Sequence, residues 1–376
     1  MAANGITLLS PIAVADYVKK GMVRRAIGGE GEEMAKNIVI FSDGTGQEGG
    51  KGNNSNVYKL FNMVENRTGK QVIFYDRGLG TGWRKLSGQV AGLGISRNIK
   101  ECYRFIFEEY QAGDQIFLFG FSRGATTVRS LSSFIDLFGV LPKSRPELID
   151  QAYRIYKISN QEKRNQRAAE FIARHHTMWC KIRFLGAWDT VAALGIPVRA
   201  LNALVNAVPF FRHDFQDLSL SESVEHARHA LAIDEERKIF APVIWEPNLY
   251  EHQTLEQVWF AGVHTDVGGG YAEQALSDIP LIWMRDEAVG FGLRIYPGHK
   301  ITLNPDPNGV MHDSRGSGPA RLLQKRIRQW DVEGHGSAIV HETVLQRTLS
   351  ARENRDEGYS PWILELDHQI RYASST

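Results

Sequence analysis

Five short apolar runs, each followed by polar or glycine-rich residues, constrain the fold of this chain more than any other feature. The runs are residues 37–41, 71–75, 115–119, 181–188 and 257–263. Their apolar character is nearly continuous, which is typical of strands buried on both faces. Helical patterns lie between them, at 57–66, 97–111, 146–158 and 161–175. Strands that alternate with helices predict an α/β fold, with a mostly parallel central sheet and helices on both faces.

Polar residues follow each of these runs and are expected to share one surface. They are Asp43, Asp76, Ser122, Asp189 and His264. Because parallel strands end at the same edge of their sheet, and ligands of such sheets bind beyond the carboxyl ends of the strands, we expect a functional site at this edge.

Residues 120–124 read Gly-Phe-Ser-Arg-Gly, a G-x-S-x-G motif between the third run and an apolar-faced helical pattern at 125–138. A serine on a sharp strand-to-helix turn is a nucleophile elbow, and the flanking glycines leave room for the turn. The motif therefore predicts Ser122 as a nucleophile. The alternative is an ordinary turn in which Ser122 caps the helix.

A serine hydroxyl needs a base to take its proton and a third group to orient that base. In hydrolases with this elbow, the chain order is serine, acid, histidine. Asp189 and His264 follow two of the apolar runs in that order. His312 is the rival for the base, and Asp43 and Asp266 are rivals for the acid.

Two other histidines, His226 and His229, fall in a polar helical pattern at 221–232 and are less suited to the role of base. Asp266 has a second interpretation, because it can hold the glycine-rich loop that follows it or support His264.

The transition state of ester cleavage needs backbone N–H groups that stabilise an oxyanion. Arg123, the residue after the nucleophile, is expected to supply one of them. The loop at Asp43 is expected to supply another, from Gly44 or Thr45. Asp-Gly also favours a simple Asx-type turn at this place.

The same side chains suggest a different chemistry. Asp43, Asp189, Asp266 and His264 could ligate a divalent ion in a metal-assisted phosphodiesterase. No local metal-binding motif supports this alternative, so we expect neither a metal nor another cofactor. A third alternative is a hydrolase-like binding module without catalysis.

Charge and composition narrow the class of partner. Lysine and arginine number 44 against 43 acidic residues, a net charge of +1 that argues against a broad nucleic-acid-binding surface. No apolar run is long enough to span a bilayer. The basic residues near the N-terminus follow the first apolar stretch, which does not fit a secretory signal. We therefore expect a cytoplasmic protein that binds no nucleic acid.

Ordered motifs over residues 37–365 resemble one known family. They lie at 37–46, 75–82, 113–114, 119–125, 187–191, 230–237, 259–271, 311–314, 340–344 and 359–361. On these motifs the chain resembles the α/β-hydrolase family called domain of unknown function 2235, which includes phospholipase effectors of bacterial type VI secretion. The resemblance implies an ester hydrolase with Ser122, Asp189 and His264 as catalytic triad, and glycerophospholipids as substrates. It also implies delivery by a secretion system and an inhibitory or immunity protein as partner.

The expected organisation is a catalytic domain at 37–300, an N-terminal arm at 1–36 and a C-terminal extension at 301–376 packed on the same domain. A glycine-rich segment at 80–96 and an apolar segment at 196–215 are expected to be lids. The second is either a flap that enters a lipid surface, giving peripheral membrane contact, or an ordinary core helix followed by a loop. The oligomeric state is left open.

Overall fold

The structure is a computed structural model that describes residues 35–44, 49–50, 52–78, 88–191, 218–316, 321–353 and 358–373. The expected lid at 196–215 lies outside these ranges, as do nearly all of the N-terminal arm, residues 80–87 of the expected lid at 80–96, and Thr45. Within the described ranges, no helix combines the length and the apolar character needed to cross a lipid bilayer.

One eight-stranded sheet forms the centre of the fold, in the order β2-β1-β3-β4-β5-β6-β7-β8. Its strands are β1 (Asn37–Ser42), β2 (Gln71–Asp76), β3 (Gln115–Phe121), β4 (Ile182–Trp188), β5 (Val224–Ala232), β6 (Thr254–Phe260), β7 (Ala338–His341) and β8 (His368–Arg371). Neighbouring strands pair in parallel throughout this order. The predicted α/β fold with a mostly parallel sheet is therefore confirmed.

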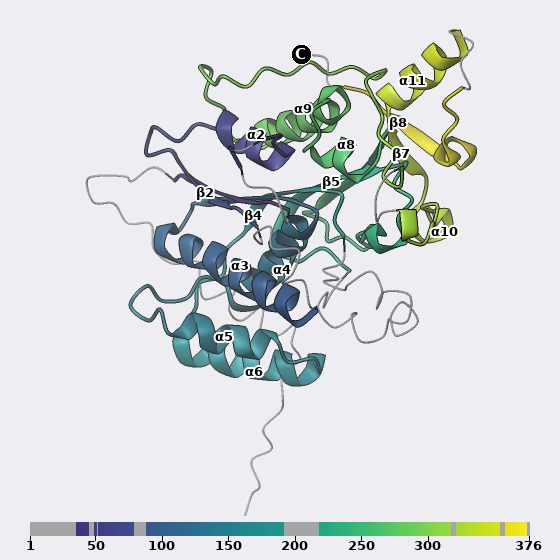
Figure 1. The fold of residues 1–376 in the computed structure, drawn as a ribbon. Coiled ribbons are helices and arrows are strands. Elements are labelled where there is room, and N and C mark those ends of the chain that lie inside the picture. Colours follow the sequence, from purple (N-terminus) through teal and green to yellow (C-terminus); the bar gives the residue numbers. More distant parts are fainter. Residues whose placement is uncertain are drawn as a thin grey trace, which may run out of the picture.

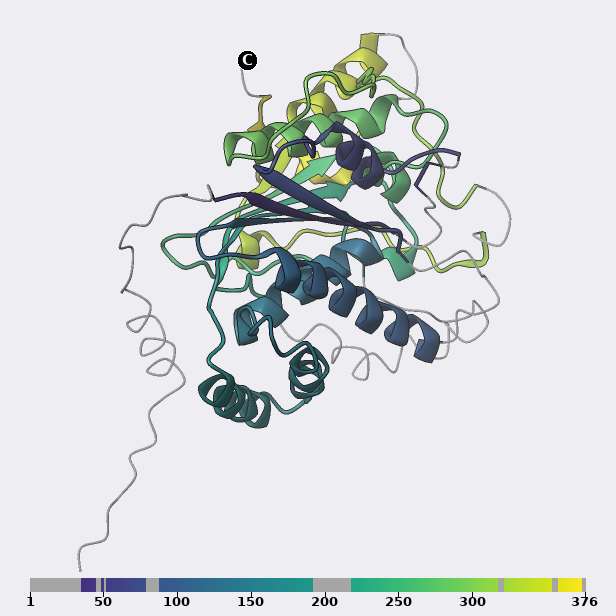
Figure 2. The ribbon, with the colours of Figure 1, turned by 90° about the vertical axis from the view of Figure 1, so that its left-hand side faces the viewer.

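Helices cover both faces of this sheet (Figure 1). One face carries α3 (Gly88–Glu109), α4 (Arg123–Phe138), α5 (Leu148–Tyr156) and α6 (Gln161–His175). The other carries α2 (Asn56–Met63), α8 (His264–Gly268) and α9 (Ala275–Gly290). The side view of Figure 2 shows the sheet between these two layers.

Alternate side chains of each central strand enter two different cores. In β1, Ile38 and Ile40 pack into the core shared with α3 and α4, whereas Val39 and Phe41 pack into the core shared with α2 and α9. All six residues of β1 are buried. Burial on both faces explains why the run is apolar without alternation.

The connection order of the first three strands creates the place for a site. β1 lies between β2 and β3, and the helices that follow β1 and β2, α2 and α3, lie on opposite faces of the sheet (Figure 1). The connections that leave β1 and β3 therefore go to opposite faces of the sheet. Parallel α/β sheets bind their ligands at such a point, beyond the carboxyl ends of the strands. Ser122 directly follows β3 at this point.

The helical pattern expected at 221–232 is wrong, because this segment contains β5. The strand is paired on both sides, by β4 and by β6. Its polar side chains have partners that make their burial tolerable: Arg228 Nε lies 2.6 Å from Glu287 Oε2, and the buried His229 ring accepts the Thr190 N–H at 3.1 Å. Long-range pairing, not local pattern, decides the structure of this segment.

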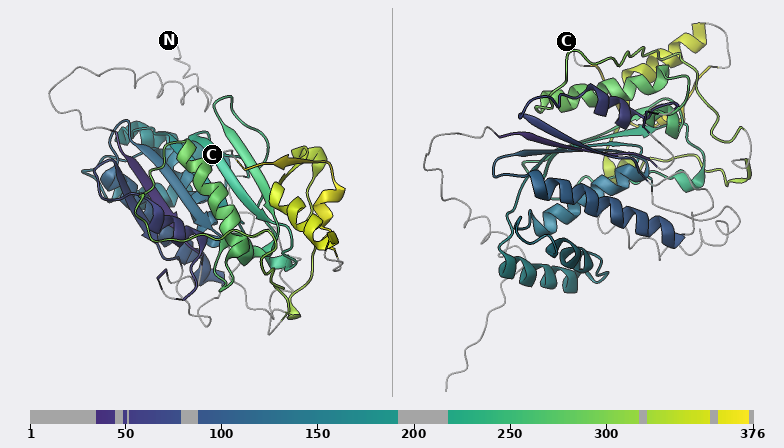
Figure 3. Two further views of the ribbon diagram at one scale, coloured as in Figure 1. Left: turned by 90° about the horizontal axis from the view of Figure 1, so that it is seen from above. Right: turned by 60° about the vertical axis from the view of Figure 1, so that its left-hand side comes forward.

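The C-terminal residues extend the same sheet. β7 pairs with β6, and β8 pairs with β7. Trp259 of β6 packs edge-to-face against Trp330 and Trp362, with ring centroids 6.0 and 5.4 Å apart. Seen from above in Figure 3, the C-terminal segment (yellow), which includes α11 (Glu342–Glu353), lies at one edge of the sheet. Residues on both sides of position 300 thus share one core.

Candidate active site

Ser122 lies on a strained turn between β3 and α4. Its backbone has φ 57° and ψ −119°, a conformation that residues other than glycine rarely adopt. The Ser122 N–H donates to the Trp188 carbonyl at 3.0 Å, which ties the turn to the end of β4. Ser122 occupies the N-cap position of α4, but its side chain makes no capping hydrogen bond. The structure therefore does not support the alternative in which the Ser122 side chain only caps the helix.

The two glycines of the motif are needed because backbone segments approach closely here. A Cβ atom at Gly120 would lie 2.5 Å from the Gly124 carbonyl oxygen. A Cβ atom at Gly124 would lie 2.0 Å from the Ser42 carbonyl oxygen at the end of β1. Both positions therefore exclude a side chain, and α4 can begin directly against the sheet.

Three side chains form a hydrogen-bonded chain at this edge of the sheet. His264 Nε2 lies 2.9 Å from Ser122 Oγ, and His264 Nδ1 lies 2.6 Å from Asp189 Oδ2. With the ring proton on Nδ1, the imidazole donates to Asp189 and accepts the Ser122 hydroxyl proton. The three residues are 7%, 4% and 0% exposed for Ser122, His264 and Asp189. The structure thus brings together the three residues that chain order had selected.

The His264 ring is held from several sides. His264 is the first residue of α8, which starts shortly after β6, so it lies beyond the strand end itself. Its backbone N–H donates to Glu235 Oε2 at 3.3 Å. Its ring packs against the rings of Phe121 and Phe240, with centroid distances of 4.7 and 4.8 Å. Apolar walls and a fixed backbone restrict the orientations open to the imidazole.

Asp189 is paired with an arginine that the sequence did not indicate. Arg328 Nη1 and Nη2 lie 2.6 and 2.8 Å from the two carboxylate oxygens. The Ala232 N–H also donates to Asp189 Oδ1, at 3.1 Å. Complete burial opposes ionisation of the Asp189 carboxyl, but the charge and hydrogen bonds of Arg328, together with the hydrogen bond to His264, outweigh it. The pKa of Asp189 consequently lies well below its usual range.

Asp43, the first rival for the acid, belongs to a separate buried network. Its Oδ2 accepts the hydroxyls of Ser55 and Tyr75, at 2.5 and 2.7 Å. Burial raises the pKa of Asp43 to about 6, although these hydrogen bonds act in the opposite direction. None of its described partners is His264. Asp43 therefore fixes the loop after β1.

That loop differs from the predicted oxyanion site. Gly44 does lie beside Ser122, since a Cβ atom on it would be 3.5 Å from Ser122 Cβ. Its N–H, however, donates to Asp43 Oδ1 at 2.7 Å, so it is already engaged. Thr45 lies outside the described residues. In those that are described, the Arg123 N–H at the start of α4 makes no hydrogen bond, so Arg123 stays a prediction for this role.

His312 and Asp266, the other two rivals, are paired with each other. His312 Nδ1 lies 2.6 Å from Asp266 Oδ1, and the His312 ring stacks on Tyr271 with centroids 3.7 Å apart. The second oxygen of Asp266 accepts the Val263 N–H at 3.1 Å. Asp266 thus holds the loop before α8 and supports His312, and its carboxylate makes no contact with the His264 ring.

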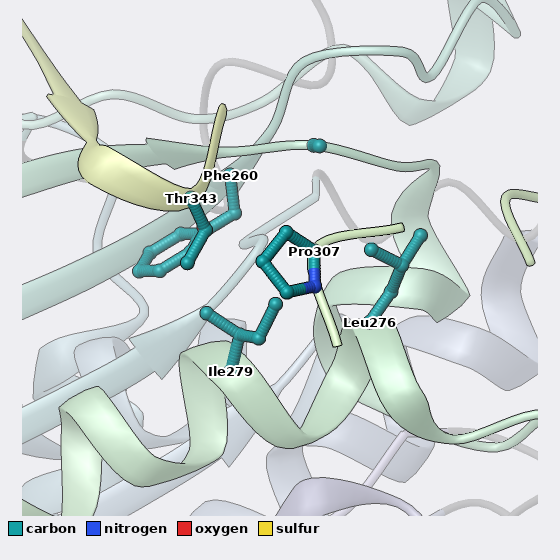
Figure 4. Close-up of a pocket in the computed structure, with 6 residues that line it drawn as sticks. Phe260, Leu276, Ile279, Pro307 and Thr343 are labelled. Carbon is teal, nitrogen blue, oxygen red and sulfur yellow. The ribbon is translucent and has the colours of Figure 1, made fainter. Parts of the chain in front are cut away.

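A small apolar pocket lies elsewhere and lacks the groups for chemistry. It is lined by residues of β6, α9 and α11, with Pro307 between them (Figure 4). Phe260, Leu276 and Ile279 supply most of its apolar wall, and it has no room for a water molecule. The residues that line it do not include Ser122, Asp189 or His264. Across the described ranges, no group of three or more His, Cys, Asp and Glu side chains is arranged to hold a metal ion.

Comparison with known proteins identifies the family. Residues 36–287 match the family described as "T6SS, Phospholipase effector Tle1-like, catalytic domain". The chain belongs to this family. Ser122, Asp189 and His264 lie inside the matched segment, whereas Arg328 lies beyond its end. The predicted relationship to type VI secretion phospholipase effectors is therefore confirmed at the level of the family.

Individual relatives are more distant. A yeast protein, the uncharacterized protein YEL023C of Saccharomyces cerevisiae, is 28% identical over 242 residues, 57% of this chain and 33% of that protein. A crystal structure of an uncharacterized protein from Pseudomonas aeruginosa is 16% identical, with a TM-score of 0.41, and covers 78% of this chain and 50% of that one. The Tle1 effector bound to the VgrG spike of the type VI secretion system is 18% identical, with a TM-score of 0.32, and covers 64% and 52%. The chain thus spans about a third to a half of the length of these relatives.

Proposed function

We propose that this protein is a serine hydrolase that cleaves carboxylic esters of glycerophospholipids through an acyl-enzyme intermediate. The observation that carries the proposal is the hydrogen-bonded chain from Ser122 through His264 to Asp189, with Ser122 on a strained elbow at the carboxyl edge of the sheet. Membership of a phospholipase effector family supports the choice of substrate class.

In the first half of the reaction, Ser122 Oγ attacks the ester carbonyl carbon while His264 Nε2 takes the hydroxyl proton. The imidazolium that forms is stabilised by the Asp189 carboxylate on Nδ1. The tetrahedral intermediate then collapses: the bond to the leaving oxygen breaks, and that oxygen receives the proton from His264 Nε2. The alcohol leaves, and the acyl group stays on Ser122.

In the second half, water replaces the alcohol. His264 Nε2 takes a proton from the water as its oxygen attacks the acyl carbon, and returns the proton to Ser122 Oγ as the acyl bond breaks. The products are a fatty acid and the free enzyme. The Arg123 N–H, at the N-terminus of α4, is our candidate donor to the oxyanion in both halves.

The side chain of Arg123 adds support for an anionic substrate. Burial lowers the pKa of the Arg123 guanidinium to about 10, which still leaves it charged at neutral pH. It follows Ser122 directly, and no charge of another described residue contributes to this shift. A cation in this position suits an ester that carries a phosphate group. Contact with a membrane surface, delivery by a secretion system and an inhibitory partner protein are further proposals that rest on family membership alone.

A serine-reactive fluorophosphonate probe tests the mechanism. We expect the probe to label the protein, and labelling to disappear in Ser122→Ala because the reacting oxygen is removed. Ser132→Ala, a buried serine of the same helix α4, is the matched control and should be labelled normally. Chelators should leave both labelling and ester hydrolysis unchanged.

The same experiment separates the alternatives. Hydrolysis of a phosphodiester that survives Ser122→Ala and stops with a chelator would support the metal-assisted phosphodiesterase. Absence of both labelling and hydrolysis would support a binding module. Mass spectrometry of mixed lipids incubated with pure protein then identifies the ester that is cut, with lysophospholipid and free fatty acid as the expected products.

A further inference from the structure

We propose that Arg328 is a positioning residue of this site, which holds Asp189 in the orientation and charge state that direct His264 toward Ser122. The inference rests on the proposed function and deepens it. It adds to the site a residue from beyond the segment that the family match covers, residues 36–287.

The contact between the two side chains has the geometry of a dedicated pair. Both terminal nitrogens of Arg328 engage Asp189, at 2.6 and 2.8 Å, one on each carboxylate oxygen. A planar guanidinium matches a carboxylate in this two-point manner, and a lysine ammonium cannot. Arg328 is itself only 5% exposed, so water does not compete for these hydrogen bonds.

Arg328 is held in place by two backbone carbonyls. Its Nη1 donates to the Ala232 carbonyl at the end of β5, and its Nη2 donates to the Phe240 carbonyl, each at 2.7 Å. The ring of Phe240 packs on the His264 ring. The same guanidinium therefore fixes the carboxylate that orients the imidazole and one of the walls that confine it.

The positive charge of Arg328 compensates the negative charge of the buried Asp189 carboxylate. Asp189 is completely buried, and a buried charge is costly unless it is paired. A neutral His264 donates a hydrogen bond but supplies no charge. Of the described residues, Arg328 is the one cation in direct contact with the Asp189 carboxylate. Without it, Asp189 would take up a proton more readily, and a protonated His264 would be favoured next to the uncompensated charge.

The other charged groups nearby do not contact the Asp189 carboxylate. Glu235, which accepts the His264 backbone N–H, is paired with Arg237 at 2.7 Å. Burial lowers the pKa of His229 to about 3, so this ring behind Asp189 is neutral. Buried Arg129 lies beyond His229 and also acts on it electrostatically. Removal of Arg328 therefore changes the charge balance at Asp189 without a second cation in contact to replace it.

Three variants test the proposal: Arg328→Met, Arg328→Lys and, as matched control, Arg326→Met at an exposed arginine of the same segment. We expect Arg328→Met to lower kcat/KM for a soluble short-chain ester about 100-fold, within the range that a positioned general base contributes. The acidic limb of its pH profile should move to higher pH. Arg328→Lys should show a smaller loss and a smaller shift. Arg326→Met should match the wild type in both.

Chemical rescue provides a readout that a purely structural role would not give. In Arg328→Ala, added ethylguanidinium should restore part of the lost rate, whereas a tetraalkylammonium salt at equal ionic strength should not. Thermal melting reports whether each variant is folded. If Arg328→Met and Arg328→Ala do not fold, Arg328→Lys decides: a wild-type rate and pH profile in that variant would overturn the proposal. A folded Arg328→Met with an unchanged profile would overturn it as well. A wild-type protein that neither hydrolyses esters nor reacts with the probe would instead refute the proposed function.

Discussion

Two residues of the candidate site, Ser122 and Asp189, have positive φ angles although neither is glycine. The angles are 57° and 40°. Such a backbone costs about 1–3 kcal/mol per residue and persists only where its surroundings hold it. Here the two N–H groups donate to sheet carbonyls, Ser122 to Trp188 and Asp189 to Ala230, at 3.0 and 2.8 Å. The strain is concentrated where the side chains must leave the sheet and meet His264.

A prediction at this scale concerns Asp43. Its pKa of about 6 lies above the value of about 4 in an unfolded chain. The folded protein thus binds this proton more tightly, so the contribution of Asp43 to the free energy of unfolding is present below about pH 4 and is lost as pH rises through about 6. We expect the wild type to lose about 2–3 kcal/mol between pH 4 and pH 7 relative to Asp43→Asn, which lacks this titration.

Urea unfolding at the two pH values measures this difference. Asp306→Asn, at an exposed aspartate, is the control and should follow the wild type. If the free energy of unfolding had the same pH dependence in Asp43→Asn and in the wild type, ionisation of the buried Asp43 carboxyl would carry no cost. The prediction would then be wrong.

At the scale of elements, the junction of β3 and α4 depends on backbone packing more than on side chains. Gly120 and Gly124 let the first turn of α4 rest against the end of β1. Any atom added there must move either the helix or the strand, and Ser122 lies between them. The position of Ser122 therefore depends on how β1, β3 and α4 pack together.

Gly124→Ala tests this dependence. The added methyl group would lie 2.0 Å from the Ser42 carbonyl oxygen, and we expect a loss of about 1–3 kcal/mol in the free energy of unfolding, as for other overpacked sites. The rate of fluorophosphonate labelling should fall as well. Gly69→Ala, where a Cβ atom meets nothing within 4 Å, is the control. Normal stability and labelling of Gly124→Ala would contradict the close approach of α4 and β1.

The elements differ in how well their sequences predict them. β1, β3 and β4 are mostly apolar because both of their faces are buried, and their apolar runs can be found from the sequence alone. β5 contains Arg228 and His229, which the sequence places in a polar helical pattern. Their partners, Glu287 of α9 and Thr190 after β4, are distant in the sequence, so the local pattern does not reveal them. β7 and β8 have four residues each, too few for a periodic pattern.

The residues of the site also differ in how well the local sequence predicts them. Ser122, Asp189 and His264 each follow an apolar run, so the local sequence is enough to predict their place at strand ends. Arg328 lies in an exposed polar segment, and no local pattern distinguishes it from Arg326. Its proposed role depends on tertiary contacts, with Asp189 above all. The conformation of Asp43 likewise decides which N–H groups of the loop after β1 can donate to an oxyanion, and the sequence does not give that conformation.

At the scale of the whole molecule, the segment after residue 300 completes both the sheet and the site. Val340 of β7 and Ile363 pack with Leu231 and Trp259 in one buried cluster. Arg328 reaches Asp189 from the same segment. The candidate site and the edge of the core thus rely on the same part of the chain.

A chain that ends at residue 300 tests this interdependence. We expect it to melt at a lower temperature than the full chain or to remain unfolded, because Leu231 and Trp259 lose their C-terminal partners. It should also fail to react with the fluorophosphonate probe. A chain that ends at residue 373 keeps every contact named here and serves as control. A truncated chain with full stability and full labelling would show that residues 301–376 are dispensable.

The pairing of Asp189 with Arg328 also has a consequence for synthesis on the ribosome. Chains emerge from the N-terminus, and their early parts begin to fold during translation. Ser122, Asp189 and His264 are all made before Arg328. A nascent chain can therefore carry the three proposed triad residues for some time before Arg328, which pairs with Asp189, leaves the exit tunnel. The order of residues along the chain therefore delays completion of the site until residue 328 has emerged.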